Sequence, residues 1–316
     1  SQDTPSLQSE LLLELARLLD EQLGDANAAE RVYERLIEVD ADNPEVVLTA
    51  SRALEEIHLA KGDHLHLADD LRRQITFETD DQTRLELLVR LGGLLEEVLE
   101  DVEGAIDAHR QRLEIDPADL WAMRALERIL EQTEQWQELI NVLQRRDAAE
   151  DEPAERRQIA LRIGFIYEEK LEDTKNAIAA YNEVLTSHGP DAEALRALGR
   201  LYESSERWVD LLETVQMRID QSDDPTERAE LRYRASDLMR TRTGDVEKAI
   251  RGYEEVLNEI PDHAGALADL EAVMSDTTYP HRFEAARVAQ PRYEAAAAYD
   301  KLLGVLEVLA DIDDPQ

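Results

Sequence analysis

Apolar residues recur with the period of an α-helix along nearly the whole chain. They cover more than half of the circumference of a helix over residues 85–99, as is typical of a helix packed on two sides. Alternating β-branched runs bounded by Asn-Gly turns, which mark β-hairpins, do not occur. The pattern therefore predicts an all-α chain. The apolar set in this window is Leu85, Leu87, Leu88, Leu91, Leu94, Leu95, Val98 and Leu99.

This helical pattern repeats at a fixed interval. Asp25, Asp101, Asp173 and Asp245 lie 76, 72 and 72 residues apart, and an Ala follows each of them by four positions. A ring follows each Ala by four positions, on the same helix face. We expect the small residue to let a neighbouring helix approach and the ring to fill the groove beside it. The pairs are Ala29/Tyr33, Ala105/His109, Ala177/Tyr181 and Ala249/Tyr253.

A second landmark and the prolines have the same interval. Trp136 recurs as Trp208 after 72 residues, His64 precedes Trp136 by 72, and Tyr299 repeats the landmark later than expected. Each 72-residue stretch, here called a double repeat, is predicted to contain two helix pairs of about 36 residues. The double repeats are 8–80, 81–152, 153–224 and 225–316. Pro44, Pro117, Pro190 and Pro261 are expected after the second helix of a pair, and Pro153, Pro225 and Pro315 at the start of a double repeat.

The last double repeat is longer than the others. Pro190 and Pro225 are 35 residues apart, whereas Pro261 and Pro315 are 54 apart, which leaves 54 − 35 = 19 additional residues. We predict that the segment near 279–297 adds one or two short helices. Because proline lacks the N–H that a helix interior needs, we expect a break before Pro291.

Three segments share an aliphatic residue followed by Gly and, three positions after the Gly, a large residue. They are Leu195-x2-Leu198-Gly199-x2-Tyr202, Ile163-Gly164-x2-Tyr167 and Leu91-Gly92-x2-Leu95. These segments resemble the tetratricopeptide repeat family, whose pattern runs Trp-x2-Leu-Gly-x2-Tyr, Ala-x3-Phe and Pro. The first matches with Leu in place of Trp, the second matches as well, and the third is a weaker copy. The resemblance covers nearly the whole chain in degenerate copies. It implies a right-handed superhelical solenoid of antiparallel helix pairs as a single domain over residues 1–316.

The resemblance also implies where a ligand binds. In this family the first helix of each pair lines a concave groove that holds peptides or helices of other proteins. The apolar residues among the matching positions fit an amphipathic-peptide groove, or they are core residues placed there by a one-residue alignment error. The matching positions are Val89, Met123, Leu161, Phe165, Glu168, Glu193, Arg196, Arg200, Glu203, Tyr233 and Asp237.

Charge narrows the choice of partners. Lys and Arg number 35 against 72 Asp and Glu, so the net charge is 35 − 72 = −37. Nucleic acid and anionic membranes need basic clusters, and the chain is unsuited to either. Only five Lys are present and they are scattered, so the Lys/Asn clamp that some family members use for a partner's carboxylate is not expected. The acidic surface favours a basic or amphipathic protein partner, or else it reflects adaptation to salt.

Motifs for catalysis are not found. Cysteine is absent, and neither phosphate-binding glycine loops nor a Gly-x-Ser-x-Gly elbow occurs. His58, His64 and His66 lie near several Asp and were considered as metal ligands. Residues two apart on a helix point about 200° apart, and His64 takes the place of a packing Trp, so packing is the preferred interpretation. We expect no catalytic residue, no metal and no cofactor.

Together these features predict a non-catalytic scaffold for protein–protein interaction. The alternative is an adaptor or regulatory segment of a larger multidomain enzyme or assembly factor. Asp313-Asp314-Pro315 matches Asp223-Asp224-Pro225, which opens a double repeat, so we expect a fragment of a longer array. Self-association through an uncapped C-terminal face is the other possibility. No signal peptide is seen at the polar N-terminus, which favours the cytoplasm and leaves the periplasm open if the chain is processed.

Overall fold

The structure is a computed structural model that describes residues 4–277 and 280–311. Every regular element in these two ranges is a helix, which confirms the predicted all-α class. The chain divides into two compact units, Ser1–Glu152 and Pro153–Gln316, here called the N-terminal and C-terminal units. This division falls at the joint between the second and third predicted double repeats. The predicted joint at Pro315 lies outside the described residues.

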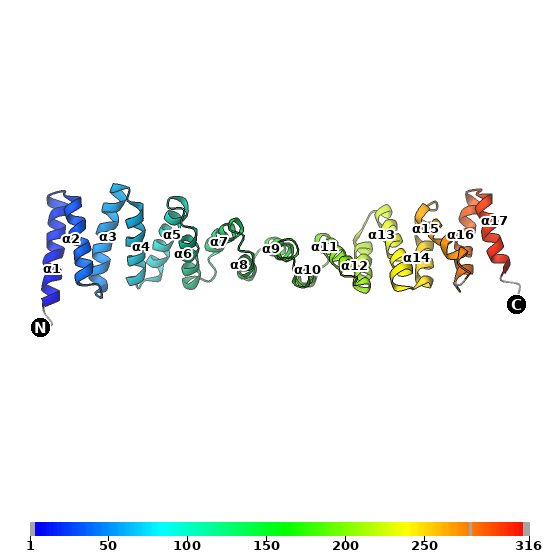
Figure 1. The fold of residues 1–316 in the computed structure, drawn as a ribbon, viewed down its shortest axis with the longest axis horizontal. Coiled ribbons are helices and arrows are strands. Elements are labelled where there is room, and N and C mark those ends of the chain that lie inside the picture. The colour runs from blue at the N-terminus through cyan, green and yellow to red at the C-terminus, as the bar shows by residue number, and fades with distance from the viewer. Residues whose placement is uncertain (1–3, 278–279, 312–316) are drawn as a thin grey trace. The chain divides into compact units, whose positions relative to one another are not determined.

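The N-terminal unit is a row of helix pairs in chain order (Figure 1, blue to green). Each helix packs on the next one along the chain, so the second helix of one pair contacts the first helix of the following pair. A π-helical turn, η1, extends the first helix. The elements are α1 (Thr4–Arg17), η1 (Leu18–Gln22), α2 (Ala26–Val39), α3 (Pro44–Lys61), α4 (His64–Phe77), α5 (Asp81–Glu97), α6 (Val102–Ile115), α7 (Leu120–Gln132) and α8 (Trp136–Ala149).

The C-terminal unit has the same construction with one more helix in its last part. The π-helical turns η2 and η3 extend α9 and α13 as η1 extends α1. The elements are α9 (Pro153–Phe165), η2 (Ile166–Lys170), α10 (Thr174–His188), α11 (Ala192–Ser204), α12 (Trp208–Gln221), α13 (Pro225–Leu238), η3 (Met239–Thr243), α14 (Val246–Glu259), α15 (Ala264–Ser275), α16 (Arg282–Ala295) and α17 (Tyr299–Ala310).

The repeated Asp residues are helix N-caps. Each accepts a hydrogen bond from the backbone N–H three residues later, which satisfies one of the free donors of the first turn. The bonds measure 3.0 Å for Asp25 and for Asp101, and the residue before each cap has a positive φ in every copy. The sequence motif therefore marks a tight turn between the two helices of a pair. The caps are Asp25, Asp101, Asp173 and Asp245, and the preceding residues are Gly24, Glu100, Glu172 and Gly244.

The Ala and ring pairs lie in the core, as predicted. All eight side chains of the four pairs are buried. Opposite the ring stands a small residue of the first helix, and Gly164 is so close to Tyr181 that a Cβ would lie 2.7 Å from the ring. The close approach of helices through small residues is thus confirmed, and it joins the two helices of a pair.

Two predictions about proline have different outcomes. Pro153 and Pro225 begin α9 and α13, as expected for a residue whose N–H would have no helical partner. Pro44 follows the second helix α2, as predicted, and itself begins α3. The expected break before Pro291 is wrong, because α16 runs continuously from Arg282 to Ala295 through this residue. Pro291 is on the exposed side of α16, where water can satisfy the carbonyl group left without an N–H donor.

None of the helices in residues 4–277 and 280–311 has the length and apolarity needed to cross a membrane.

Candidate functional site

The predicted ligand-contacting positions lie mainly on the first helices of the pairs. On α11, Glu193, Arg196, Arg200 and Glu203 are exposed, and their spacing of three, four and three residues places them on one side. Leu198 is buried on the other side, against the core. We call this exposed side of α9–η2, α11 and α13 the first-helix face of the C-terminal unit, and that of α5 and α7 its counterpart in the N-terminal unit.

An ion pair joins α9–η2 to α11 on this face. Arg200 Nη2 donates to both oxygens of Glu168, at 3.0 and 3.2 Å. Glu168 Oε2 also accepts from the hydroxyl of Tyr181, at 2.9 Å. Burial raises the pKa of Tyr181, and the bond to Glu168 raises it further. Glu168 is therefore held by two partners, and its side chain is largely covered.

Two further ion pairs continue along the face. Arg234 of α13 donates to Glu203 of α11 at 2.7 Å, and both side chains are exposed. Arg240 of η3 donates to Asp237 and to Asp269 of α15, each at 2.9 Å. Neighbouring first helices in the C-terminal unit are thus linked by one charged contact after another.

Ion pairs also link neighbouring first helices in the N-terminal unit. Arg128 of α7 pairs with Glu96 of α5, and Arg90 of α5 pairs with Glu55 of α3. The hydrogen bond from Arg128 lowers the pKa of Glu96. Glu96 and Arg128 each lie 72 residues before Glu168 and Arg200, so this pair is part of the repeat. The sequence carried this signal in the recurrence of Glu and Arg at the 72-residue interval.

The apolar candidates separate into exposed and buried residues. Val89 and Phe165 are each 49% exposed. Met123 is fully buried and Leu161 is 4% exposed, so neither can line a surface. The assignment of these two residues to the surface is therefore wrong. For Met123 the alignment is one residue off, since its neighbour Arg124 is exposed on α7.

Tyr233 is occupied by packing within its own unit. Its ring lies 4.8 Å from that of His263 and 6.1 Å from that of Tyr253, between α13, α14 and α15. A Cβ on Gly265 would lie 2.7 Å from the Tyr233 ring, which shows how closely α15 approaches. Its half-buried ring therefore belongs mostly to the core of the C-terminal unit.

Sequence reasoning missed the most exposed aromatic residue of the first helices. Trp121, near the start of α7, is 77% exposed. It lies 72 residues before Glu193, a position that had been assigned to the groove, so the repeat interval alone identifies it. Trp121 gives the N-terminal unit an apolar anchor on its first-helix face.

The C-terminal unit also has a hollow rich in arginine. It has a volume of about 450 Å³ and includes Arg157, Arg196 and Arg218 among its lining residues. Arg157 Nε donates to Asp191 at 2.5 Å, and burial lowers the pKa of Arg218. The hollow lies where α9, α11 and α13 begin and α12 ends, beside the first-helix face.

A larger hollow of about 810 Å³ lies between α6, α7 and α8 of the N-terminal unit. Leu113, Leu126, Leu130 and Val142 supply its apolar lining. Asn141 of α8 is exposed at its rim. This hollow has a partly apolar lining and lies beside the second helices α6 and α8.

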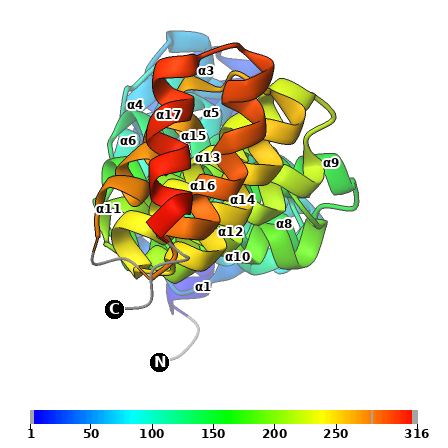
Figure 2. The same ribbon diagram turned by 90° about the vertical axis from the view of Figure 1, so that its right-hand side faces the viewer.

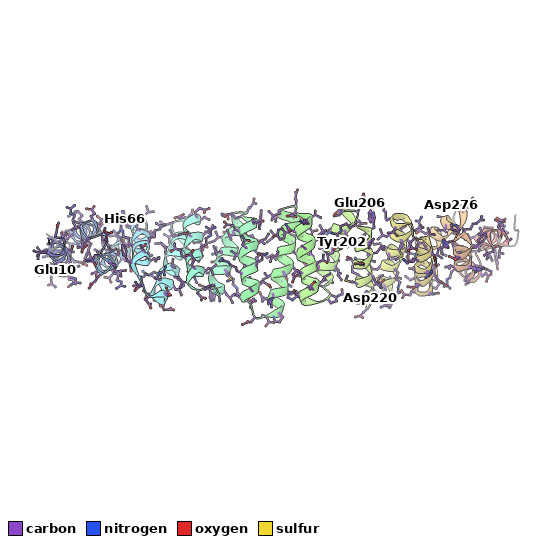
Figure 3. All side chains as sticks on the ribbon, turned by 90° about the horizontal axis from the view of Figure 1, so that it is seen from below. Glu10, His66, Tyr202, Glu206, Asp220 and Asp276 are labelled. Carbon is purple, nitrogen blue, oxygen red and sulfur yellow. The ribbon has the colours of Figure 1, made fainter. Side chains whose placement is uncertain are left out.

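Two of the clustered histidines are engaged in contacts within the N-terminal unit. His58 and Asp70 are buried and joined Nδ1 to Oδ2 at 2.6 Å, and the ring of His66 stacks on His58 at 5.2 Å. Among the described residues no group of three His, Cys, Asp or Glu side chains is arranged to hold a metal ion. Side chains project from the helices along both units in Figure 3, and the labelled Glu10, Glu206 and Asp220 are exposed.

Comparison with models of known protein families finds matches that recur at the 72-residue interval. Family models described as tetratricopeptide repeat match residues 9–43, 122–156, 159–189 and 194–229. None of the matching models describes an enzyme. No protein with curated annotation matches the chain.

Solved structures with similar folds include several repeat proteins. YrrB, described as a TPR protein with an unusual peptide-binding site, is 18% identical, with 61% of this chain and 98% of that chain covered and a TM-score of 0.33. A tetratricopeptide repeat protein from Parabacteroides merdae is 14% identical, with 84% and 98% covered and a TM-score of 0.30. The Naa15/Naa10 complex bound to HypK-THB is 13% identical, with 98% and 50% covered and a TM-score of 0.40.

Proposed function

The chain belongs to the tetratricopeptide repeat family, and on that premise we propose that it is a non-catalytic scaffold that binds a basic, amphipathic segment of another protein along its first-helix faces. The observation that carries the proposal is Phe165, a half-exposed ring on a face that also exposes Glu193 and Glu203. An apolar side chain of the partner would cover Phe165, and basic side chains beside it would meet these carboxylates.

Apolar burial and charge attraction both favour a basic, amphipathic ligand. Fully covering a large exposed apolar side chain contributes about 1.5–3 kcal/mol, and covering the exposed half of Phe165 contributes about half as much. The Glu203–Arg234 pair is exposed on both sides, and such a pair is worth about 0–1 kcal/mol, so a basic residue of the partner can replace Arg234 at low cost. With a net charge of −37, the chain also attracts basic segments over a distance.

The faces of the two units give the ligand two anchors of the same kind. Trp121 serves the N-terminal unit as Phe165 serves the C-terminal unit. A partner with two suitable segments would gain from binding both, because the second contact becomes intramolecular after the first.

The test is selection of peptides from a random displayed library against the full chain, followed by affinity measurement on variants. The variants are Phe165→Glu and Trp121→Glu for the first-helix faces and Asn141→Trp to fill the hollow between α6, α7 and α8. Val209→Glu is the matched control, because Val209 is an exposed apolar residue of α12.

We expect the selected peptides to be basic with at least one large apolar residue. Their affinity should fall at least tenfold for Phe165→Glu or Trp121→Glu, stay unchanged for Val209→Glu, and weaken between about 0.1 and 0.5 M salt. Peptides that bind Phe165→Glu and Trp121→Glu as well as the unaltered chain, and that lose affinity for Asn141→Trp, would move the site to the hollow of the N-terminal unit. Selection of acidic peptides would refute the proposed chemistry.

A further inference from the structure

Two arginines of the hollow in the C-terminal unit recur elsewhere in the chain. Arg196 of α11 and Arg218 of α12 line this hollow of about 450 Å³, and α11, α12 and α13 pack there one on the next (Figure 2, green to yellow-green). Arg124 of α7 and Arg146 of α8 precede the two arginines by 72 residues. The partners of the same two positions can therefore be compared between the units.

In the N-terminal unit both arginines are paired with glutamates. Glu150, which follows α8, lies 3.9 Å from Arg124 and 3.9 Å from Arg146. Glu127 of α7 accepts hydrogen bonds from Arg146 Nη1 at 3.0 and 3.2 Å, and these two side chains are buried. One carboxylate is thus shared by the two arginines, and a second neutralises the buried one.

The first double repeat carries the same two glutamates. Arg52 of α3 donates to Glu78 at 3.0 Å, and Gln74 of α4 donates to Glu55 at 2.6 Å. All four residues lie 72 positions before the set in α7 and α8. In the first two double repeats, the basic or amide side chain at each of these positions therefore has a carboxylate supplied by the chain itself.

Neither glutamate is present in the C-terminal unit. Ser222 stands at the position of Glu150, and Gly199 stands at the position of Glu127. Arg157, a further arginine of the hollow, lies 72 residues after a leucine. Compared with its counterpart, the hollow has therefore lost two negative charges and gained one positive charge.

The two recurring arginines are left without close carboxylates. In the described ranges 4–277 and 280–311, Arg196 forms no ion pair. Arg218 has Glu227 at 3.7 Å, which is beyond hydrogen-bond distance. The Arg218 side chain is only 23% exposed, so water compensates its charge only in part. Burial lowers the pKa of Arg218, and neighbouring Arg234 and Arg196 lower it further, although Glu227 opposes them.

The two acidic residues that line the hollow are already engaged. Asp191 accepts hydrogen bonds from two backbone N–H groups at the start of α11, at 2.9 Å each, and from Arg157. Glu227 accepts from the hydroxyl of Ser222 at 2.7 Å. Three arginines against two carboxylates leave a local positive charge in a chain whose net charge is −37. The hollow is therefore suited to an anion.

We propose that the hollow binds the side-chain carboxylate of an acidic residue of the protein ligand, with Arg196 and Arg218 as its partners. The ligand carboxylate takes the place that Glu150 has beside Arg124 and Arg146. Guanidinium groups suit this role because they present parallel N–H donors to the two oxygens of a carboxylate. The inference rests on the proposed function for the nature of the ligand, and it adds one acidic residue to an otherwise basic, amphipathic segment.

The test is an NMR titration of the full chain, labelled with ¹⁵N, at about 0.05 M NaCl. The probe is N-acetylglutamate N-methylamide, which carries a single carboxylate, and the corresponding glutamine compound is the uncharged control. The signals observed are the side-chain Nε–Hε groups of Arg196, Arg218 and Arg124, assigned from the three Arg→Lys variants. Arg124 is the internal reference, because its carboxylate is present in the fold.

Two variants at one position separate charge from shape. Ser222→Glu restores the carboxylate of the other copies, and Ser222→Gln has nearly the same shape without the charge. For the unaltered chain and Ser222→Gln we expect saturable shifts of the Arg196 and Arg218 signals with the glutamate compound only. Ser222→Glu should bind it at least tenfold more weakly, because its own carboxylate occupies the arginines.

Three results would overturn the inference. The first is that Arg196 and Arg218 respond no more than Arg124, which would make them ordinary solvated arginines. The second is equal binding by Ser222→Glu and Ser222→Gln. The third comes from a parallel titration with the phosphoserine compound: binding at least tenfold tighter than that of the glutamate compound would assign the hollow to a phosphorylated side chain instead of a carboxylate.

This site and the first-helix face can fail separately. Phe165 does not line the hollow, so Phe165→Glu should leave the titration unchanged. A failed titration, with selected peptides that still depend on Phe165, would remove only the carboxylate site. A saturable titration, with peptides that bind Phe165→Glu and Trp121→Glu as well as the unaltered chain, would remove only the binding proposed for the first-helix faces.

Discussion

Three corresponding positions of the repeat carry charged or titratable residues in the N-terminal unit and uncharged residues in the C-terminal unit. In the N-terminal unit, buried His58 of α3 bonds Asp70 of α4 through Nδ1 and approaches Glu30 of α2 through Nε2, at 2.6 and 3.4 Å. The counterparts in the C-terminal unit, by the repeat interval, are the buried residues Tyr202, Thr214 and Ile178. A charged network and a nearly apolar cluster thus support the same helix-pair geometry.

The charged version depends on a complete set of partners. Arg73 donates to Asp70 at 3.0 Å, and Lys61 donates to Glu30. Burial raises the pKa of Asp70, while the bond to His58 opposes this, so the carboxylate is costly to bury and is compensated by its neighbours. The hydrogen bond from Lys61 lowers the pKa of Glu30.

The nearly apolar version is completed by two hydrogen bonds between uncharged groups. Thr214 donates its hydroxyl hydrogen to the carbonyl oxygen of Asp210 at 2.8 Å, and the Tyr202 hydroxyl accepts from Asn182 at 3.0 Å. Tyr202 and His66 are labelled in Figure 3. The comparison teaches that packing volume sets this position, and that charge is an addition that must be fully paired.

Removing one member of the network should have the largest effect. Asp70→Val leaves His58 without its closest partner, and breaking a buried pair in this way costs about 3–5 kcal/mol. The counterpart change Thr214→Val should cost no more than about 1.5 kcal/mol, because it removes one local hydrogen bond. Hydrogen exchange of the full chain should show lost protection in α3 and α4 for the first variant only. Equal effects in the two units would contradict the contrast between them.

Replacing all three residues of the network by their counterparts from the C-terminal unit should restore the stability that Asp70→Val loses. The triple variant Glu30→Ile, His58→Tyr, Asp70→Thr gives the N-terminal unit the residues of the C-terminal unit. Replacing a buried ionic group by well-packed residues is often neutral or stabilising by about 1–4 kcal/mol. Urea unfolding should place the triple variant at or above the unaltered chain. A triple variant as unstable as Asp70→Val would mean that the ions also determine the geometry.

Gly164 and Gly92, which correspond to each other in the two units, differ in how closely a ring packs against them. A Cβ on Gly164 would lie 2.7 Å from the Tyr181 ring, whereas on Gly92 it would lie 3.2 Å from His109 Cε1. Overpacking typically costs about 1–3 kcal/mol, and the helix propensity gained in either variant offsets about 1 kcal/mol of it, so we expect Gly164→Ala to be the more destabilised, by up to about 2 kcal/mol. In Gly92→Ala the helix propensity gained, about 1 kcal/mol, should nearly offset the milder contact. Thermal unfolding of the two variants gives the order directly, and the opposite order would show that the rings shift more freely than their burial suggests.

The repeat interval made the helices and core rings predictable, because each depends on local sequence. Tyr33 could be assigned to the core from spacing alone, whereas Asp25 was recognised as a repeated residue and its role as a helix cap came from the structure. The surface was less predictable, because one residue corresponds to about 100° around a helix, and that error exchanged Arg124 for the buried Met123. The bond from His58 to Asp70 could not be derived from helical period, because it joins two helices across a turn. Continuation of α16 through Pro291 depended on solvent exposure, which the sequence does not state.

The smallest expected effect concerns pH and the ring at the repeat position of His109 and Tyr181. Burial lowers the pKa of His109, and neighbouring Arg112 lowers it further. The unfolded chain, with an ordinary histidine pKa of about 6.5, therefore takes up a proton before the folded chain does. This contribution to stability is fully present above pH 6.5 and is lost as the pH falls below it, by about 1.4 kcal/mol for each unit by which the pKa is lowered.

His109→Tyr gives the N-terminal unit the ring of the C-terminal unit and should remove this loss. Gly92 opposite the ring corresponds to Gly164 opposite Tyr181, so the larger ring has space of the same kind. The bond to Asp63 raises the pKa of His66, which acts in the opposite direction, but it is present in both proteins and cancels in their difference. The free energy of unfolding, measured between pH 7.5 and 5.5, should fall less for the variant than for the unaltered chain. If the free energies of unfolding of the two proteins change in parallel with pH, His109 is protonated as easily in the folded chain as in the unfolded one. Its burial would then not lower its pKa.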